Sequence, residues 1–595
     1  KETKKTYYNA ASGKVRKRLH WLQIEEKEGK RPCCSPCLRR GEICLYRISF
    51  IGPAWGFVAG DNPAFNPEFE DGPISTNIEP QGPLTTLQFP TIEAPLEYTE
   101  SGMFGITNPS AFSDFETTRE QAPSSPFMSS RQPISLPPPN VLRELIDIFF
   151  ERIYIYIPIL HRSRFLAELD SKGPEVRSQP LLFAICAVSA ARHPNPGIRE
   201  SQRSWYDVAR ETLSKSLHSP DDLLATLQAA VIIIYQANIF AEYSTSWLLT
   251  SDAWRIAVVT GCARLDGNLR STPLKFKLGV GNSWMQKEEC RRALWMLFVF
   301  DRGLCSLDLA PAIDDQQLNI NLPMADDIFS GEDEPIDIEP IGYTSSIDKL
   351  MDRIETEIRL GNNTNIRQFI VAAYMLLGRI GSEIYQNEFD YTKGTSVLDS
   401  LSASLIRLRL LIPQEATELS FADPRDFKLV IWLNAIMTAN TIFLYHQPLL
   451  NGESFDEPSG MSNNWPLCVA ASRNLVAGLR DMCRSSTDFA DDAFLASLVY
   501  AGSRILIIEY ILSSNDMTPR RSGNFSVVSS RSQNLKADID LLYHIFRHFK
   551  VSLGCSGEQF YDAFVHSMTI DEESSRTAKA GSLLDMLRIC DRWPS

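Results

Sequence analysis

The sequence predicts a mainly α-helical fold, and two observations lead to that expectation. From residue 141 to residue 549, apolar side chains recur at helical spacing in one segment after another. Alternation typical of strands is rare, and its clearest instance is the short run Leu318, Ile320 and Leu322. We find no internal repeat of fixed period, which argues against a regular solenoid. We therefore expect a large body built from packed helices.

Three segments are expected along the 595 residues, because a chain of this length exceeds a single core. Residues 1–50 are basic, since residues 1–47 hold thirteen Lys and Arg against five Asp and Glu. Residues 51–136 are rich in proline and acidic, and residues 137–595 form the helical body. A basic end beside an acidic segment is typical of a protein that contacts a polyanion, with a plain solvated terminus as the alternative.

The basic segment ends in a group of cysteines. Cys34 and Cys37 are spaced C-x2-C, and six residues separate Cys37 from Cys44. A C-x2-C turn directs two thiolates at one metal ion, and a short helix can return a third. This spacing in a basic segment favours a zinc site over three unligated thiols.

Residues 29–46 resemble the second half of the fungal Zn2Cys6 zinc cluster. The resemblance implies Zn2+ as cofactor, double-stranded DNA as partner once the cluster is complete, and a place in the nucleus. The implied zinc ligands are Cys34, Cys37 and Cys44, and the implied contacts to DNA phosphates are Arg31, Arg39 and Arg40. Whether the protein forms a homodimer stays open.

The zinc cluster is incomplete in this sequence. Members of that family carry three more cysteines shortly upstream, and residues 1–32 contain none. Three thiolates cannot satisfy two zinc ions, so the chain as written is not expected to bind specific DNA tightly. Two explanations stay open: an upstream exon is missing from the sequence, or the regulator has lost DNA binding.

The second segment, residues 51–136, is expected to be disordered. Prolines recur from Pro53 to Pro126, and its unbalanced acidic charge opposes burial. The acidic-aromatic pieces at residues 65–70 and 112–116 resemble activation segments that bind a coactivator. A plain solvated linker is the alternative.

Helices are expected in succession through the third segment. Pro137 to Pro139 end the extended stretch, and Asn140 is expected to cap the first helix. Apolar periodicity predicts helices at residues 141–150, 181–191, 205–217, 223–240, 246–262 and 287–305. After an acidic loop at 326–339, it predicts helices at 346–360, 365–386, 397–411, 424–444, 465–483, 491–512 and 535–549.

The helical segment also resembles a known family. Residues 149–150 with 158–165, residues 288–302, residues 310–313 with 318–323, and residues 446–449 are similar to motifs of the fungal-specific transcription factor domain, also called the middle homology region. The resemblance covers about residues 137–450. It implies an all-helical regulatory domain.

Charged and aromatic residues of the body are interpreted as structural. Ala293 to Phe300 is apolar on every face, so other helices must surround it. Glu288 and Glu289 are expected near the start of that helix, where the helix dipole favours acids. Ion pairs are expected for Arg291, Arg292, Asp301 and Arg302, a packed and hydrogen-bonded ring for His161, and core positions for Trp247, Trp254 and Trp295.

Neither an enzyme nor a membrane protein is expected. Paired acids such as Asp326-Asp327 lack the second acid that a DDxxD magnesium site needs, and no nucleotide-binding or hydrolase motif occurs. The apolar run at 223–240 contains Gln228 and Gln236, which favours a core helix. Scattered cysteines such as Cys186, Cys262 and Cys290 are typical of buried free thiols.

The features together predict a sequence-specific regulator of RNA polymerase II transcription. It would bind DNA through the zinc cluster and be regulated by its helical domain. The alternative is a non-DNA-binding helical partner protein derived from such a regulator. Zinc content separates the two, because a complete cluster holds about two zinc ions.

Overall fold

The structure is a computed structural model. It describes residues 134–174, 178–267, 283–304, 311–335, 339–361, 365–386, 394–446, 464–485, 492–515 and 525–580. The predicted zinc ligands, the predicted phosphate-contacting arginines and the linker up to residue 133 lie outside these residues. The chain divides into two units, and every described residue belongs to the second, Gln121–Ser595.

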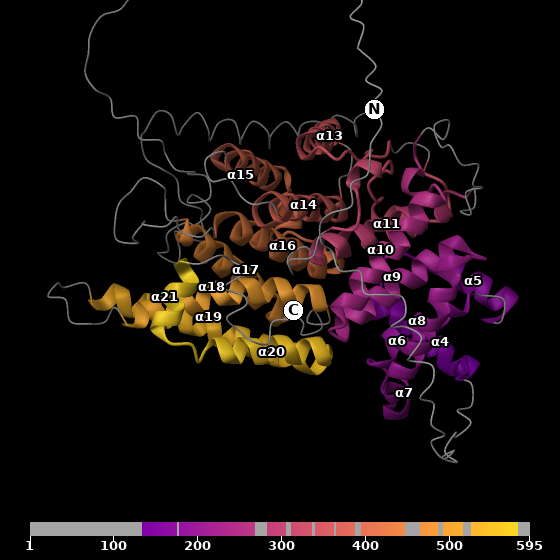
Figure 1. The fold of residues 1–595 in the computed structure, drawn as a ribbon, viewed down its shortest axis with the longest axis horizontal. Coiled ribbons are helices and arrows are strands. Elements are labelled where there is room, and N and C mark those ends of the chain that lie inside the picture. The colour runs from indigo at the N-terminus through magenta and orange to yellow at the C-terminus, as the bar shows by residue number, and fades with distance from the viewer. Residues whose placement is uncertain are drawn as a thin grey trace, which may run out of the picture. The chain divides into compact units, whose positions relative to one another are not determined.

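Helices make up most of the described residues, so the predicted mainly α-helical fold is confirmed (Figure 1). The first elements are α4 (Pro139–Ile148), η2 (Phe149–Ile153), α5 (Arg162–Lys172), α6 (Gln179–Ala190), α7 (Pro196–Glu200), α8 (Gln202–His218), α9 (Leu223–Ile239), α10 (Tyr243–Val259), η4 (Cys262–Arg264) and α11 (Trp284–Leu304). The next are η7 (Asp315–Gln317), α12 (Asp326–Phe329), α13 (Ile347–Leu360), α14 (Ile366–Ile380), η8 (Gly381–Gln386), α15 (Gly394–Leu411), η9 (Gln414–Ala416) and η10 (Pro424–Asp426). The last are α16 (Phe427–Tyr445), α17 (Trp465–Ser485), α18 (Ala493–Asn515), α19 (Phe525–Ser552), α20 (Cys555–Ser567) and α21 (Glu572–Ala580).

The helices pack in two groups. In the first, α6, α8 and α9 pack on one another, and α9 and α10 also contact α11. In the second, α14, α16, α17, α18, α19 and α20 form a series in which each helix contacts the next. The groups meet where α11 packs on α14, and where α9 touches α18 and α20. Figure 1 shows α11 and α14 between the indigo-to-magenta helices and the orange-to-yellow ones.

Helix α9 shows how the sequence produces a core helix. Every residue from Leu223 to Ile239 is buried, so neighbouring helices cover all of its faces. Asp222 caps its start by accepting a hydrogen bond from the Ala225 backbone N–H at 3.0 Å. Each of its buried isoleucines contributes about 1.5–3 kcal/mol of hydrophobic stabilisation. The helix ends just before Ala241, whose φ of 59° is incompatible with a continued helix.

Other helix starts follow from local side chains. Asn365 and Gln368 form a capping box at the start of α14. The prediction that Asn140 caps the first helix is wrong, because α4 begins one residue earlier, at Pro139. Proline suits the first helical turn, where its fixed φ is helical and its missing N–H needs no partner.

Several helices fall where none is predicted: α5, α7, α12, α20 and α21. The one with most consequence is α12, because it lies inside the predicted acidic loop and buries Phe329 completely. The strand-like run from Leu318 to Leu322 is extended but short. Among the described residues it forms an isolated antiparallel β-bridge, between Asn321 and Gly342.

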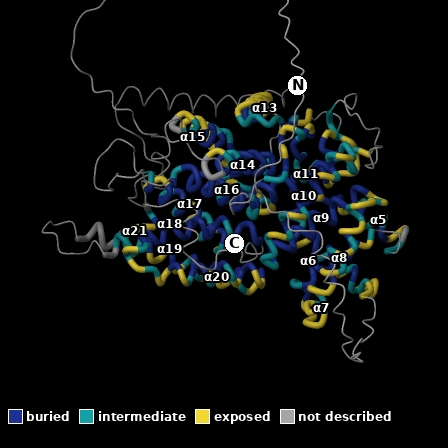
Figure 2. The backbone as a smooth tube through the Cα atoms, in the orientation of Figure 1, coloured by how far each residue is buried: buried dark blue, intermediate teal, exposed yellow. Residues whose placement is uncertain are grey.

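Burial is greatest along the helices that join the two groups. Figure 2 shows the tube dark blue through α9, α11 and α14, with exposed segments toward α7, α13 and α20. Two segments, Pro424–Tyr445 and Ala493–Ser513, are long and apolar enough to cross a membrane by length and composition. Within the body, 83% and 72% of their apolar windows are buried, so they pack here as core helices.

Candidate functional site

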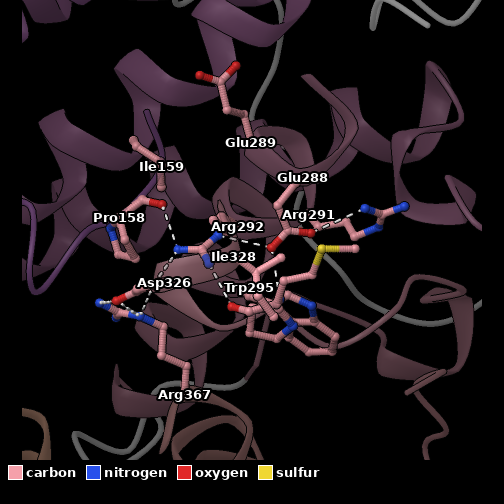
Figure 3. Close-up of polar contacts among 12 residues, drawn as sticks. Pro158, Ile159, Glu288, Glu289, Arg291, Arg292, Trp295, Asp326, Ile328 and Arg367 are labelled. Carbon is pink, nitrogen blue, oxygen red and sulfur yellow. Dashed lines mark hydrogen bonds and ion pairs between the residues drawn. The ribbon is translucent and has the colours of Figure 1, made fainter. Parts of the chain in front are cut away.

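The buried charges of the body gather around α11. Glu288, in its second turn, is fully buried. Its Oε1 accepts hydrogen bonds from Arg292 Nε at 3.0 Å and from the Met324 backbone N–H at 2.9 Å, and its Oε2 accepts from Arg291 Nη1 at 3.2 Å. Spacings of three and four residues place both arginines on the helix face of Glu288. One carboxylate therefore orients two guanidinium groups (Figure 3).

Asp326, the first residue of α12, joins α11 to α14. Its Oδ1 accepts a hydrogen bond from Arg292 Nη1 at 2.7 Å. Arg367, in the first turn of α14, donates to the same carboxylate from Nε at 2.9 Å and from Nη2 at 2.6 Å. The two arginines are 1% and 7% exposed, whereas the Asp326 side chain is 34% exposed. Figure 3 shows this carboxylate between the two guanidinium groups, which it holds together.

Main-chain carbonyl groups also accept hydrogen bonds from Arg292 and Arg367. Arg292 donates to Met324 O at 2.6 Å and to Pro158 O at 3.5 Å, and Arg367 Nη2 donates to Ile155 O at 3.0 Å. Buried guanidinium groups need such acceptors to offset the loss of water. As a result, the segment after η2 and the segment before α12 are both fastened to the α11–α14 contact.

Glu289 points away from this cluster and holds the start of α5 (Figure 3). Its Oε1 accepts a hydrogen bond from the His161 backbone N–H at 2.7 Å, and its Oε2 pairs with Arg164. The His161 ring is 2% exposed, lies 3.1 Å from Gly331 O through Nε2, and meets the Phe329 ring edge-on. Its Nδ1 accepts from the Arg164 backbone N–H at 3.2 Å. The predicted packed histidine is confirmed.

Arg291 anchors the loop that follows α10. Its Nε and Nη2 donate to the two oxygens of Asp266 at 2.7 and 2.6 Å, a bidentate arrangement. Asp266 also accepts from the Asn321 backbone N–H at 2.7 Å. This pair therefore ties the loop after α10 to both α11 and the extended run.

A second buried pair lies at the other end of α11. Asp301 pairs with Arg302 and accepts from the Ala312 backbone N–H at 2.7 Å. Arg302 donates to Ile313 O at 3.0 Å and lies over the Phe298 ring, with its guanidinium carbon 4.6 Å from the ring centre. With this pair, the prediction that Arg291, Arg292, Asp301 and Arg302 form ion pairs is confirmed.

Opposite charges outweigh burial in setting the protonation of the cluster. Burial disfavours the charged carboxylate of Asp326, but Arg367 and Arg292 more than compensate and hold its pKa well below the usual range. Burial likewise disfavours the charged guanidinium of Arg292, but Asp326 and Glu288 outweigh it and raise its pKa. Both groups are therefore charged near neutral pH, and neither is poised for general acid–base catalysis.

A small cavity lies against the same arginines. Its lining includes Arg292, Trp295, Arg367 and Trp432, and its volume is about 30 Å³. Pockets for small-molecule ligands measure about 300–1,000 Å³, and a cavity of this size has room for about two water molecules. Trp295, predicted as core, is buried and also lines this cavity.

The arrangement suits positioning rather than chemistry. The charged side chains bridge helices that lie far apart in the sequence, and each is engaged by partners inside the protein. In the part of the chain that the structure describes, no group of three or more His, Cys, Asp and Glu side chains could hold a metal ion. The predicted zinc ligands are outside that part.

The sequence predicted that the arginines of α11 form ion pairs, but it did not predict the partners that α12 and α14 supply. Asp326 was predicted to lie in an acidic loop, and that prediction is wrong because the residue begins the helix α12, where it pairs with Arg292 and Arg367. Glu288 and Glu289 lie near the start of α11, as predicted, but in its second turn and not its first. Their carboxylates accept hydrogen bonds from arginines and backbone N–H groups, which stabilise their charge. Trp254 is buried as predicted, whereas Trp247 is half-buried.

Comparison with known proteins places this cluster in a family context. Residues 146–407 match the fungal specific transcription factor domain. The matched range includes α11, α12 and α14, so the ionic cluster lies within the part of the chain that is similar to this domain, as the resemblance of residues 288–302 led us to expect. Of the late motif at 446–449, only His446 is among the described residues.

The relatives of the chain are transcriptional regulators of fungi. The azaphilone cluster-specific transcription factor of Aspergillus niger is 29% identical over 191 residues, covering 31% of this chain and 40% of the relative. The pigment biosynthesis transcriptional activator of Monascus ruber is 25% identical over 192 residues, covering 31% of this chain and 33% of the relative. An uncharacterized transcriptional regulatory protein of Schizosaccharomyces pombe is 22% identical over 473 residues, covering 70% and 47%.

The chain spans less than half the length of each of these relatives. No solved structure matches it.

Proposed function

We propose that this protein is a sequence-specific regulator of RNA polymerase II transcription. The observation that carries the proposal is the joint occurrence of two features in one chain. Residues 146–407 match the fungal specific transcription factor domain, and a basic segment with the C-x2-C-x6-C pattern precedes that domain. Each feature alone is less specific than the pair. The relatives, which are named as transcription factors and activators, support the same proposal.

The zinc segment supplies DNA binding in this proposal. Cys34, Cys37 and Cys44 bind Zn2+ through thiolates, which fill three positions around a tetrahedral ion. These three thiolates do not complete a binuclear cluster, so a specific DNA-binding form requires further ligands. Arg31, Arg39 and Arg40 lie beside the metal and contact phosphates, which position the protein without reading bases. Such a protein acts in the nucleus.

The helical body serves as the regulatory domain. Its buried ionic cluster fixes how α11, α12 and α14 sit together, which gives the body a defined surface for regulation. The acidic-aromatic pieces at residues 65–70 and 112–116 are the proposed contact for a coactivator. The body acts by association, without catalysis.

Zinc content and salt-dependent DNA binding test this function. The natural protein, with the N-terminus that its transcript encodes, should bind zinc and a duplex containing CGG. The variant Cys34→Ser/Cys37→Ser should lose both, whereas Cys555→Ser, which removes an exposed thiol of the body, should keep both. Because each neutralised phosphate contributes about −0.9 to the slope of log K against log salt, Arg39→Ala/Arg40→Ala should flatten that slope by about 2. Zinc below one ion per chain together with salt-insensitive binding would contradict the proposal.

A second candidate is a non-DNA-binding helical partner protein. The observation that favours it is the lack of any cysteine in residues 1–32, where the resemblance calls for three. For this candidate the natural protein binds fewer than one zinc ion and no duplex, yet co-purifies with another transcriptional regulator. Sequencing the 5′ end of the transcript shows which N-terminus to test.

A further inference from the structure

Ser330 ends α12 on the exposed side of this short helix. Its side chain is exposed, and its hydroxyl donates a hydrogen bond to Asp327 O at 2.8 Å. Asp327 lies three residues earlier on the same face and is exposed as well. The residues from Gly331 to Glu334 are also exposed and belong to no helix. A protein that approaches from solvent therefore meets the Ser330 hydroxyl together with the chain that follows it.

The two residues beside Ser330 are anchored inside the body. Phe329 is fully buried, with the guanidinium carbon of Arg292 at 4.0 Å from its ring centre. The His161 ring meets Phe329 edge-on, and His161 Nε2 lies 3.1 Å from Gly331 O. The hydroxyl is thus exposed at a point where both neighbouring residues hold α12 against α5 and α11.

Acidic residues follow Ser330 in the sequence. Glu332, Asp333 and Glu334 occupy the second, third and fourth positions after it, and all three are exposed. No Lys or Arg occurs from residue 303 to residue 348. Protein kinases select their substrates partly by the charges that flank the hydroxyl, and a kinase with a basic peptide groove favours acids after it. Gly331 adds no side chain that would hinder the approach.

This combination is uncommon among the hydroxyl groups of the body. In the described part of the chain, no other exposed serine is followed by acids at all three of these positions. Thr569, which is exposed, is followed by Asp571, Glu572 and Glu573. Glu572 begins α21, so Thr569 precedes a helix start, whereas Ser330 follows a helix end. The two hydroxyls share a pattern of flanking charge and differ in their structural position.

We propose that Ser330 is a phosphorylation site for an acidophilic protein kinase, and that the phosphate releases α12 from the α11–α14 contact. In the transfer, the Ser330 oxygen forms a bond to the γ-phosphorus of ATP, and the bond from that phosphorus to the bridging oxygen of ADP breaks. ADP leaves, and the hydroxyl proton passes to the catalytic base of the kinase. This inference does not depend on zinc or DNA binding.

The phosphate destabilises α12 through its charge. It adds about −1.5 to −2 charges next to two carboxylates, because Asp327 shares the face of Ser330 and Asp326 lies one turn earlier. The phosphate ester also lacks the proton that the hydroxyl donates to Asp327 O. A phosphate at a helix end and beside acids disrupts that end by like-charge repulsion. α12 has one turn, held by the backbone N–H groups of Phe329, Ser330 and Gly331, so little opposes its unwinding.

Unwinding of α12 removes two contacts from the ionic cluster. Asp326 leaves its place between Arg292 and Arg367, and Phe329 leaves the guanidinium of Arg292. Phosphorylation therefore loosens the contact by which α11 and α14 join the two groups of helices. A phosphate on Thr569 has no such effect, because negative charge is favourable before the start of a helix.

Phosphosite mapping on the full chain tests the site. The protein is incubated with casein kinase II, an acidophilic kinase, and with ATP and Mg2+, then digested and analysed by mass spectrometry. We expect phosphate on Ser330 and none on Ser163 or Ser244, which are exposed serines without acids in the next four positions. Ser330→Ala should take up one phosphate fewer. Absence of phosphate from Ser330, whether or not Thr569 is modified, would overturn the proposal.

Amide hydrogen exchange tests the release of α12. In the kinase-treated chain, the amides of Phe329, Ser330 and Gly331 should exchange about tenfold faster or more than in the untreated chain, because their hydrogen bonds open. Kinase-treated Ser330→Ala should keep the slow exchange, whereas kinase-treated Thr569→Ala should show the fast exchange. Unchanged exchange in a chain that carries phosphate on Ser330, or equally fast exchange in treated Ser330→Ala, would refute the release.

Discussion

Replacement of Arg292 by methionine tests the importance of the buried ionic cluster. Methionine fills much of the volume of the arginine stem and keeps contact with the Phe329 ring, over which the guanidinium lies at 4.0 Å. The charge and its hydrogen bonds are lost. The body should therefore keep its helical fold but unfold more easily.

The expected loss of stability is about 3 kcal/mol. Arg292 has three short hydrogen bonds, at 3.0 Å to Glu288, 2.7 Å to Asp326 and 2.6 Å to Met324 O. Breaking a buried ion pair by removing one partner costs about 3–5 kcal/mol. We take the lower end, because Glu288 keeps Arg291, Asp326 keeps Arg367, and the Asp326 side chain is 34% exposed and can bind water.

Urea unfolding of the full chain, followed by circular dichroism, measures this loss. Arg484→Met is the matched control, since Arg484 is 71% exposed and pairs with Asp481 at 2.8 Å. That exposed pair should contribute less than about 1 kcal/mol. If Arg292→Met lowers the free energy of unfolding by no more than the control does, the buried cluster does not hold the body together and the reasoning fails.

Three further predictions concern single positions. Burial lowers the pKa of His446 from 6.5 to about 4. As the pH falls, this ring is therefore protonated in the unfolded chain before it is protonated in the folded chain, which favours unfolding. Stability should therefore fall by about 2 kcal/mol between pH 6.5 and pH 5, and His446→Gln should flatten that decline in urea titrations. The pKa of Asp326 is lowered in the folded protein, so the stability that its carboxylate contributes is present above about pH 4 and is lost as the pH falls further. The loss of stability that Asp326→Asn causes at pH 7 should therefore shrink in acid. At Gly378 an added Cβ would lie 2.3 Å from Arg302 Cδ, whereas at Gly478 the nearest atom is 3.5 Å away. Thermal melting should accordingly show Gly378→Ala destabilised by about 1–3 kcal/mol and Gly478→Ala unchanged or slightly stabilised.

The helical body was largely predictable because its signals are local. The apolar faces of α9 and α11 appear in the sequence at helical spacing and predict burial from all sides. For α20 the signal was present but overlooked, since Phe560, Ala563 and Phe564 are buried at spacings of three and four residues. A helix as charged as α5 gives a weaker periodic signal.

The partners in the ionic cluster could not be predicted from spacing. Arg292 and Glu288 share a helix, so their pairing follows from geometry. Asp326 and Arg367 lie on other helices, and their approach depends on how α11, α12 and α14 pack together. The acidic stretch predicted a loop at Asp326, and nothing in its sequence indicates the two arginines that meet this carboxylate.

Chromatin immunoprecipitation of the tagged natural protein tests the central claim most directly, because it asks whether the protein occupies DNA in the cell. We predict enrichment at a defined set of promoters that Cys34→Ser/Cys37→Ser/Cys44→Ser abolishes and Cys555→Ser preserves. An occupancy profile that is flat, or that is the same for the triple variant and the natural protein, would contradict the claim that this chain regulates genes by binding DNA through its cysteine cluster.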